Sequence, residues 1–397
     1  MHKTYYIFFL IILMFALACD QLDISSDQSN TFVKLYGASA TDIGNDIKSL
    51  NDRYIILATV TSQQGNTDIA LIQTDKFGKQ QKMDTLSMIR GGNNIASELL
   101  LTSDGGFMVI GTVDDTTGNK QTDIYIAKFS SNLELEWEKN LGTESNEMGH
   151  SIKNASSGYI IAGCTDAQDL GNGNNRGFKD IYLVKIDATG EVEWAENYGG
   201  NGDDYANEVI PFYTGYILVG TTNSFNEPGQ SNDNILIVKT NLYGSSTPSD
   251  RITYGANNND YGSSIIKVDG GYVILGTVEN SIGDNSNILV VKVEENIHNV
   301  VWNEEFESNV ALGNEIIKIE GGYIIVGSTE LPNGTAGYFI KMDQNGEKIL
   351  ENTYGGYGQR INAIESTNDG GYIMVGSSGY VGNEMIYVVK VNSDGEL

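Results

Sequence analysis

One short pattern returns seven times along the chain, and this repetition restricts the possible folds more than any other feature. Strings such as "DGGYIMVGS" (369–377) place an aromatic residue four positions before Gly or Ala. Successive aromatic residues are 49 to 57 positions apart. The aromatic positions are Tyr54, Phe107, Tyr159, Tyr216, Tyr272, Tyr323 and Tyr372. A repeat of this length predicts an array of similar structural units.

Each unit contains four segments that favour β-strands. The first has the form "NEIIKI" (314–319) and leads through a tight turn into "YIIVGS" (323–328), which is apolar throughout, as in a strand covered on both faces. A polar loop of variable length precedes the third, of the form "DIYLVKID" (180–187). An Asp-x-x-Gly turn then leads to the fourth, "EVEWAENYGG" (191–200). Since no window shows a helical period, the chain is predicted to be all-β.

The last unit lacks its fourth strand, and a matching segment stands ahead of the first unit. In the fourth strand an apolar anchor precedes an aromatic residue or Leu by four positions, as Trp194 precedes Tyr198. The segment "TFVKLYG" (31–37) has the same spacing between Phe32 and Tyr36. We therefore predict that it completes the last sheet and closes a ring, which removes exposed strand edges. The fold is then a seven-bladed β-propeller with four antiparallel strands per blade; a linear β-solenoid is the alternative, but it would not explain the displaced strand.

The N-terminal region carries the features of an export signal. Lys3 precedes an apolar run of 14 residues, which is short for a membrane span and suits a signal-peptide core. The run ends in Ala-Leu-Ala-Cys19, which resembles the lipobox of bacterial lipoproteins and implies lipidation of Cys19. An ordinary signal peptide followed by an unmodified Cys is the alternative. The predicted organisation is a signal peptide at 1–18, a polar tether at 19–30, and one propeller domain at 31–397 with repeats of about 53 residues. This implies a bacterial cell-envelope location, at the outer membrane or cell surface rather than the inner membrane.

The charge of the chain excludes one class of partner. Lys and Arg number 24 against 52 Asp and Glu, which gives a formal net charge of −28. Nucleic-acid binding depends on cations that neutralise phosphates, so this partner is excluded. No basic patch is expected to dock on anionic lipid, so membrane contact is predicted through the lipid anchor alone.

The repeat resembles a known group of proteins. The strings "YGGNGDDYANEVI" (198–210), "GYILVGTTNS" (215–224) and "DNILIVK" (233–239) resemble the bacterial β-propeller repeat of the "GGSGDDYGYAIA…GYVVTGYT…DAFVAKLD" type, found in secreted and envelope proteins. The Asp-x-x-Gly…Trp ending is also similar to the tryptophan-docking repeat of quinoprotein propellers, although no cofactor residues follow from it. The first resemblance covers essentially the whole repeat region and implies the architecture. It implies little about activity, because the fold hosts binding modules and enzymes alike.

Residues that recur at one repeat position are interpreted as architecture. His150 stands where the other copies have Asn or Ser, which places it among the polar side chains of the innermost strand. Cys164 stands where they have Thr or Ser, which favours a small buried residue over a nucleophile. Neither His150 nor His298 has a second His at metal-ligand spacing, so zinc is not expected. Six third strands carry a lysine, which is expected to pair with acidic neighbours rather than to bind anions. These lysines are Lys128, Lys185, Lys239, Lys292, Lys341 and Lys390.

Function is expected where the copies differ. The loops between the second and third strands, and those between blades, are long and share one face of a propeller; we call it the loop face, and its main loops are 165–179, 199–206 and 222–233. Carboxylates and amides with an aromatic nearby suit glycan or calcium binding, and a solvated surface without a ligand is the alternative. The candidate ligand-binding residues are Asp166, Asp169, Asn172, Asn174, Arg176, Asp203, Asp204, Tyr205, Asn223 and Asp233.

These features predict a binding or scaffolding module for a protein or a glycan outside the cytoplasm. No catalytic motif is found, so the chain is not expected to be an enzyme. No cofactor is expected, and calcium stays open. One alternative is a hydrolase or lyase acting on polysaccharide, in which a pair such as Asp203 with Asp169 would supply the carboxyl groups. The other is a purely structural envelope protein.

Overall fold

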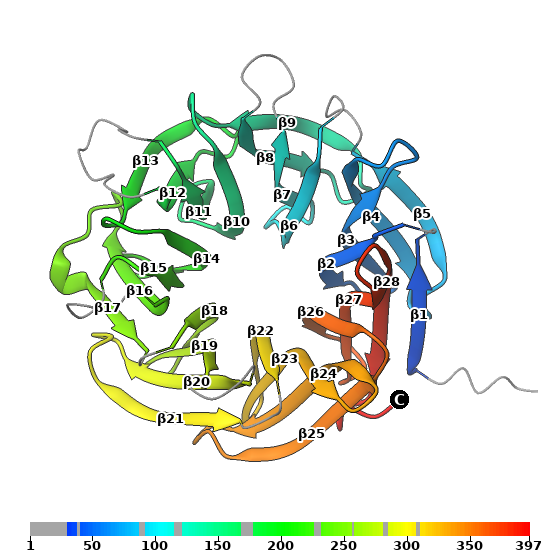
Figure 1. Ribbon diagram of the computed structural model, residues 1–397. Helices are drawn as coiled ribbons and strands as arrows, with labels where there is room; N and C mark the ends of the chain where they lie inside the picture. Colours follow the sequence, from blue (N-terminus) through cyan, green and yellow to red (C-terminus); the bar gives the residue numbers. More distant parts are fainter. Residues whose placement is uncertain are drawn as a thin grey trace, which may run out of the picture. The chain divides into compact units, whose positions relative to one another are not determined.

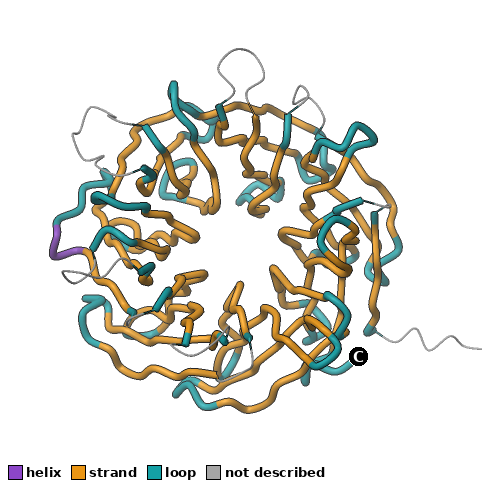
Figure 2. The backbone as a smooth tube through the Cα atoms, viewed as in Figure 1, coloured by secondary structure: helices purple, strands orange, loops and turns teal. Residues whose placement is uncertain are grey.

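The computed structural model describes residues 30–397 apart from 38–39, 87–91, 115–120, 168–177, 226–231, 256–257, 281–284 and 307–309. Residues Thr31–Leu397 form one compact unit. Seven four-stranded antiparallel sheets are arranged around a central axis, so the fold is the predicted seven-bladed β-propeller (Figure 1). Strands make up most of the described backbone, turns and loops connect them, and the 3₁₀ turn at Pro248–Asp250 is the one helical element in the described ranges (Figure 2). No helix in the described ranges has the length and apolar character to cross a membrane.

Each blade runs from an innermost strand at the axis to an outermost strand at the rim, and blades are numbered 1 to 7 from β2 onward. The innermost strands are β2 (Ile43–Ser49), β6 (Asn94–Leu101), β10 (Glu147–Asn154), β14 (Asp204–Phe212), β18 (Asp260–Val268), β22 (Ala311–Ile319) and β26 (Gln359–Ser366). The second strands are β3 (Arg53–Thr61), β7 (Phe107–Asp114), β11 (Tyr159–Thr165), β15 (Gly215–Thr222), β19 (Gly271–Glu279), β23 (Gly322–Leu331) and β27 (Tyr372–Tyr380). The third strands are β4 (Thr67–Asp75), β8 (Thr122–Phe129), β12 (Asp180–Ile186), β16 (Asn234–Asn241), β20 (Ser286–Glu294), β24 (Gly334–Asp343) and β28 (Asn383–Val391). The outermost strands are β5 (Gln80–Thr85), β9 (Leu135–Leu141), β13 (Val192–Tyr198), β17 (Arg251–Tyr254), β21 (Val300–Phe306), β25 (Lys348–Gly355) and β1 (Phe32–Tyr36).

The N-terminal strand closes the ring, as the sequence predicts. Strand β1 pairs antiparallel with β28, with Phe32 opposite Lys390. The Phe32 ring lies 6.3 Å from that of Tyr54 in blade 1, which repeats the contact of 6.0 Å between Trp194 and Tyr216. β1 therefore makes the same aromatic contact with the next blade as β13 does.

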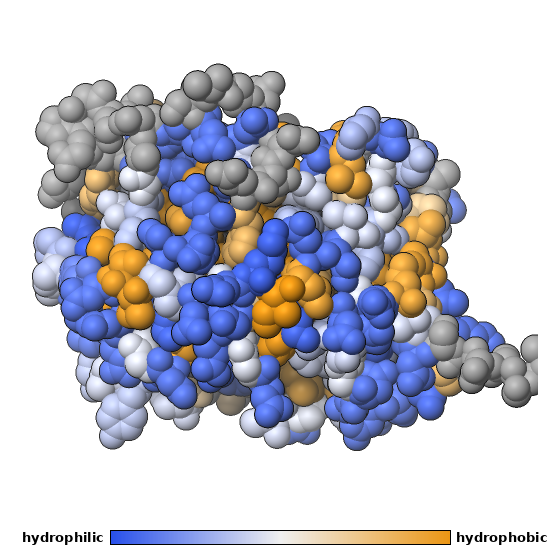
Figure 3. Space-filling model, turned by 90° about the horizontal axis from the view of Figure 1, so that it is seen from below, coloured by the Kyte–Doolittle hydropathy of each residue, from blue (hydrophilic) through white to orange (hydrophobic). Residues whose placement is uncertain are grey.

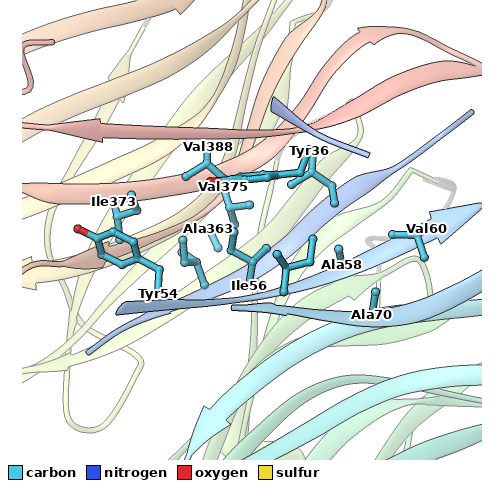
Figure 4. Close-up of a cluster of buried hydrophobic side chains, with 13 residues drawn as sticks. Tyr36, Tyr54, Ile56, Ala58, Val60, Ala70, Ala363, Ile373, Val375 and Val388 are labelled. Atoms are coloured by element: carbon cyan, nitrogen blue, oxygen red, sulfur yellow. The ribbon is translucent and has the colours of Figure 1, made fainter. Parts of the chain in front are cut away.

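The core is divided into seven apolar clusters, each shared by two neighbouring blades. The alternation of strand side chains explains the division: in β3, Ile56 faces blade 7 while Ile55 faces blade 2. Figure 4 shows the cluster between blades 7 and 1, where Tyr36 and Val388 meet Ile56. Because both faces of each second strand are covered, these strands are apolar throughout.

Every innermost strand contains a β-bulge, which the sequence pattern did not predict. One residue in each is left out of the pairing with the second strand. The skipped residues are Asn45, Ser97, His150, Asn207, Ser263, Asn314 and Asn362. The repeated Gly or Ala lies just across from the bulge: a Cβ on Gly220 would collide with the Tyr205 carbonyl oxygen. The small residue in the repeat pattern is thus required by close approach of the backbones.

The side of the propeller seen in Figure 3 is mostly hydrophilic, with separate hydrophobic patches. Several exposed apolar side chains come from outermost strands, namely Val33, Leu35, Met83, Leu135, Val192, Val300, Val301 and Ile349.

Candidate functional site

The seven innermost strands surround a polar cavity of about 120 Å³ on the axis of the ring. Each strand contributes its skipped bulge residue and the residue after it. The second set, which sequence analysis did not single out, consists of the carboxylates Asp46, Glu98, Glu208 and Glu315 together with Ser151, Ser264 and Ala363.

The first role of these side chains is to satisfy the backbone at the inner edge of each sheet. An edge strand presents N–H and C=O groups that have no partner strand. The N–H of Ile152 donates to Glu98 Oε2 at 2.6 Å, and the N–H of Ile364 donates to Glu315 Oε2 at 2.7 Å. Skipped bulge residues donate hydrogen bonds to backbone carbonyls of the next blade: Asn207 Nδ2 donates to the Gly262 carbonyl oxygen at 2.6 Å. Blade-to-blade hydrogen bonds of both kinds recur around the cavity.

Charge in the cavity is unevenly compensated. Lys153 forms ion pairs with Glu98 and, at 3.0 Å, with Glu208. Lys48 pairs with Asp46 at 3.1 Å. Glu315 has no ion pair within the described chain, and burial, followed by the charge of Asp46, raises its pKa well above the usual range.

The residues interpreted as architecture have structural roles. His150 donates from Nδ1 to the Ala206 carbonyl oxygen at 2.8 Å, and burial lowers its pKa. Cys164 is buried, and this raises the pKa of its thiol to about 12, as in an inert cysteine.

Five of the six third-strand lysines divide into two groups. Lys128, Lys185 and Lys390 pair with acidic side chains, as predicted. The prediction is wrong for Lys239 and Lys341, which donate to backbone carbonyls of the next blade, those of Glu295 and Ser393, at 2.7 and 3.0 Å. For Lys239 and Lys341, the turn after the third strand of the neighbouring blade lies within hydrogen-bonding distance of the lysine.

Among the candidate ligand-binding residues, one group gathers where blades 3 and 4 meet. Asn223 Oδ1 accepts the N–H of Asp203 at 2.7 Å, and its side chain also hydrogen-bonds Asp233. Burial, followed by the charge of Asp203, raises the pKa of Tyr205 to about 12. Asp204, at the start of β14, is fully buried. These residues therefore form a cluster, as the loop arrangement suggested.

Asp166 and Asn223 each accept a hydrogen bond from a backbone N–H group. Asp166 Oδ1 accepts the N–H of Asn146 at 2.7 Å, just as Asn223 accepts that of Asp203 in the next blade. The other predicted positions, Cys19, Asp169, Asn172, Asn174 and Arg176, lie outside the described residues.

A second feature of the loop face is a cavity of about 310 Å³ between blades 5 and 6. Its apolar lining comes from Tyr261, Val310 and Leu312, with Tyr261 at the repeat position of Tyr205. Its polar lining consists of Thr277, Glu279, Asn280, Asn285 and Ser286. The volume lies at the lower end of the range of about 300–1,000 Å³ that is usual for small-molecule sites. Sequence analysis missed this cavity, because its walls come from two blades and short loops.

Within the described ranges, no three His, Cys, Asp or Glu side chains are grouped so that they could hold a metal ion.

Comparison with known proteins supports the fold alone. No family model and no curated protein matches the chain. Among solved structures, the Dos1 propeller matches with a TM-score of 0.51 and 12% identity over 92% of this chain and 96% of that one. An acylaminoacyl peptidase in complex with Z-Gly-Gly-Phe-chloromethyl ketone matches with a TM-score of 0.51 and 12% identity over 89% of this chain. The chain spans about half (52%) of that peptidase's length. A thermostable family-43 glycoside hydrolase matches at a TM-score of 0.41 and 11% identity, over 81% of this chain and 96% of that one. The chain is thus a β-propeller protein, and its function must be argued from its own residues.

Proposed function

We propose that the protein is a binding module that acts outside the cytoplasm, anchored by a lipid on Cys19, and that it takes a glycan in the cavity between blades 5 and 6. The observation that carries the proposal is the lining of this cavity. Tyr261 and Leu312 supply an apolar wall, while Glu279, Asn280 and Asn285 supply hydrogen-bonding groups. A sugar ring has the same two characters, with apolar C–H faces and a rim of hydroxyls.

The polar groups are held in place by the fold. Glu279 Oε2 accepts a hydrogen bond from Asn259 Nδ2 at 3.0 Å, and Glu279 Oε1 accepts from the Tyr261 hydroxyl at 3.4 Å. The Asn280 N–H donates to the Asn285 carbonyl oxygen at 3.0 Å. A preorganised site of this kind loses less conformational entropy when a ligand binds.

The test is an oligosaccharide array probed with the purified protein, followed by titration of the strongest ligand. We expect Tyr261→Ala to weaken binding by about tenfold or more, since the apolar wall is lost. Tyr213→Ala is the matched control, because Tyr213 is 93% exposed in the first-to-second-strand turn on the opposite face. Equal binding by both variants, or no binding to any glycan, would overturn the glycan assignment.

The same experiment distinguishes a binding module from a polysaccharide-degrading enzyme. Release of reducing ends from a bound polysaccharide, at a rate that depends on enzyme concentration, would identify a hydrolase instead of a binding module.

A further inference from the structure

A buried aspartate between blades 3 and 4 has no partner of its own. Asp180, the first residue of β12, is 0% exposed. Neither of its carboxylate oxygens accepts a hydrogen bond within the described chain. It also forms no ion pair there, since none of the lysine or arginine contacts involves it. A buried carboxylate without a compensating partner carries a large desolvation cost.

A second carboxylate faces it across a glycine. A Cβ placed on Gly199 would collide with Asp180 Oδ1 and would lie 2.7 Å from Asp204 Oδ2, so both oxygens approach one point. The Asp204 carboxylate is held rigidly: its Oδ2 accepts the N–H of Gly200 at 2.9 Å and the hydroxyl of Ser224 at 2.6 Å. The pair is thus preorganised, with Gly199 leaving the space it needs.

Equivalent positions at other blade junctions show how such a pair is normally neutralised. Between blades 1 and 2, Asn94 Nδ2 donates to Asp68 Oδ1 at 3.3 Å. Between blades 4 and 5, Asn234 replaces Asp180 and lies beside Asp260 over Gly255. In both places an amide stands in for one carboxylate. Two junctions keep two acids: Asp123 and Glu147 approach each other over Gly142 between blades 2 and 3, as Asp180 and Asp204 do over Gly199 between blades 3 and 4. Asp180 differs from Asp123 in that neither of its carboxylate oxygens accepts a hydrogen bond within the described chain.

The surroundings add negative charge to this pair. Burial, followed by the charges of Asp204 and Asp203, raises the pKa of Asp180 to about 7. Arg251 is the basic group that acts on Asp204, and its guanidinium lies 4.2 Å from the centre of the Phe225 ring. A proton on Asp180 would neutralise only one of the two carboxylates. A divalent cation would neutralise both.

We propose that Asp180 and Asp204 bind one divalent cation of the calcium class, which joins β12 to the start of blade 4. The converging donors are oxygens, which hard cations prefer. With two carboxylates in place of three or more, the ion would keep water or backbone oxygens in its remaining positions. We therefore expect an affinity near that of weak extracellular calcium modules, with a Kd of about 10⁻⁴–10⁻³ M.

The test is thermal melting and calorimetric titration of the full-length protein at pH 8 in EDTA and in 10 mM CaCl₂. We expect Ca²⁺ to raise the Tm by about 2–6 °C with one bound ion per chain, and Mg²⁺ to act more weakly. Asp180→Asn, which installs the residue found at the next junction, should abolish the shift while melting no lower than the wild type in EDTA. Asp269→Asn is the control, because Asp269 is fully exposed in a hairpin turn and its loss should leave the shift intact.

Two results would overturn the proposal. A calcium response that survives in Asp180→Asn would show diffuse binding to the acidic surface. No calcium response, together with a stability gain at pH 6 that Asp180→Asn removes, would show that a proton occupies the pair. The outcome is independent of glycan binding, since Tyr261→Ala should keep the full calcium response.

Discussion

At the scale of single residues, the carboxylates of the axial cavity accept backbone hydrogen bonds, but they also bring negative charge into a partly buried site. Glu98 and Glu315 both accept a backbone N–H from the next blade. Glu98 is also neutralised by Lys153, whereas Glu315 is half-buried near Asp46 and has no ion pair in the described chain. Both side chains accept a backbone hydrogen bond, but Glu98 has a direct ion pair, whereas Glu315 is acted on by Lys48 without forming one.

We expect Glu315→Gln to stabilise the protein at pH 8, because the amide oxygen can still accept the Ile364 N–H. The raised pKa of Glu315 means that the folded state holds this proton more tightly than the unfolded state. Its contribution is therefore most favourable below the ordinary glutamate pKa and becomes less favourable as the pH rises toward the folded-state value. The gain in Tm, on the order of 2 °C at pH 8, should shrink toward pH 4 in differential scanning calorimetry.

We expect Glu98→Gln to change the Tm in the opposite direction from Glu315→Gln. It keeps an acceptor for Ile152 but breaks the ion pair with Lys153, so it should lower the Tm at pH 8. If both variants shift the Tm in the same direction, charge compensation does not distinguish the two sites.

At the scale of strands, the sequence was sufficient for those features that each repeat carries within itself. The aromatic and Gly positions locate the second strands, and the spacing from Phe32 to Tyr36 locates the closing strand. The bulges escaped prediction because the register depends on backbone contacts such as that of Gly220 with Tyr205. The burial of Asp180 escaped it for a related reason: its neighbour Asp204 belongs to the following blade.

Removing β1 should lower the stability of the propeller by more than the loss of five strand residues suggests. Deletion of 31–37 unpairs β28 and removes the hydrogen bond from the Tyr36 hydroxyl to the Gly78 carbonyl, 2.6 Å long. It also removes burial of Phe32 and Tyr36, worth roughly 1.5–3 kcal/mol for a side chain of this size. We expect a clear fall in Tm and association through the open edge of β28, measured by calorimetry and light scattering.

Two controls accompany this deletion. Loss of 20–30 should leave the Tm unchanged, and moving 31–37 behind Leu397 should restore it. Equal melting of the two truncated forms would contradict a stabilising role for β1.

At the scale of the whole molecule, the excess of acidic residues is expected to repel anionic partners. The net charge of −28 and the mostly hydrophilic side seen in Figure 3 support this expectation. We predict that any attachment to a membrane depends on a covalent lipid rather than on surface charge. The lipidation of Cys19 stays a prediction, because this residue lies outside the described part of the chain.

Labelling with a clickable fatty acid tests the anchor. The wild-type protein should carry the label and sediment with membranes, and Cys19→Ala should lose both properties. Unchanged sedimentation of the variant would remove the lipoprotein assignment without affecting the propeller.

The pairing of Phe32 with Lys390 also sets the order in which the protein can mature. Blades 1 to 6 are built from consecutive strands, so each can form soon after its residues leave the ribosome. Blade 7 cannot, because its outermost strand is made first and its other three strands last. Closing so long a loop is entropically costly and is expected to be slow. Until blade 7 forms, the chain is a partly folded ring with unpaired strand edges. This is the stage at which a chaperone or a protease would encounter it.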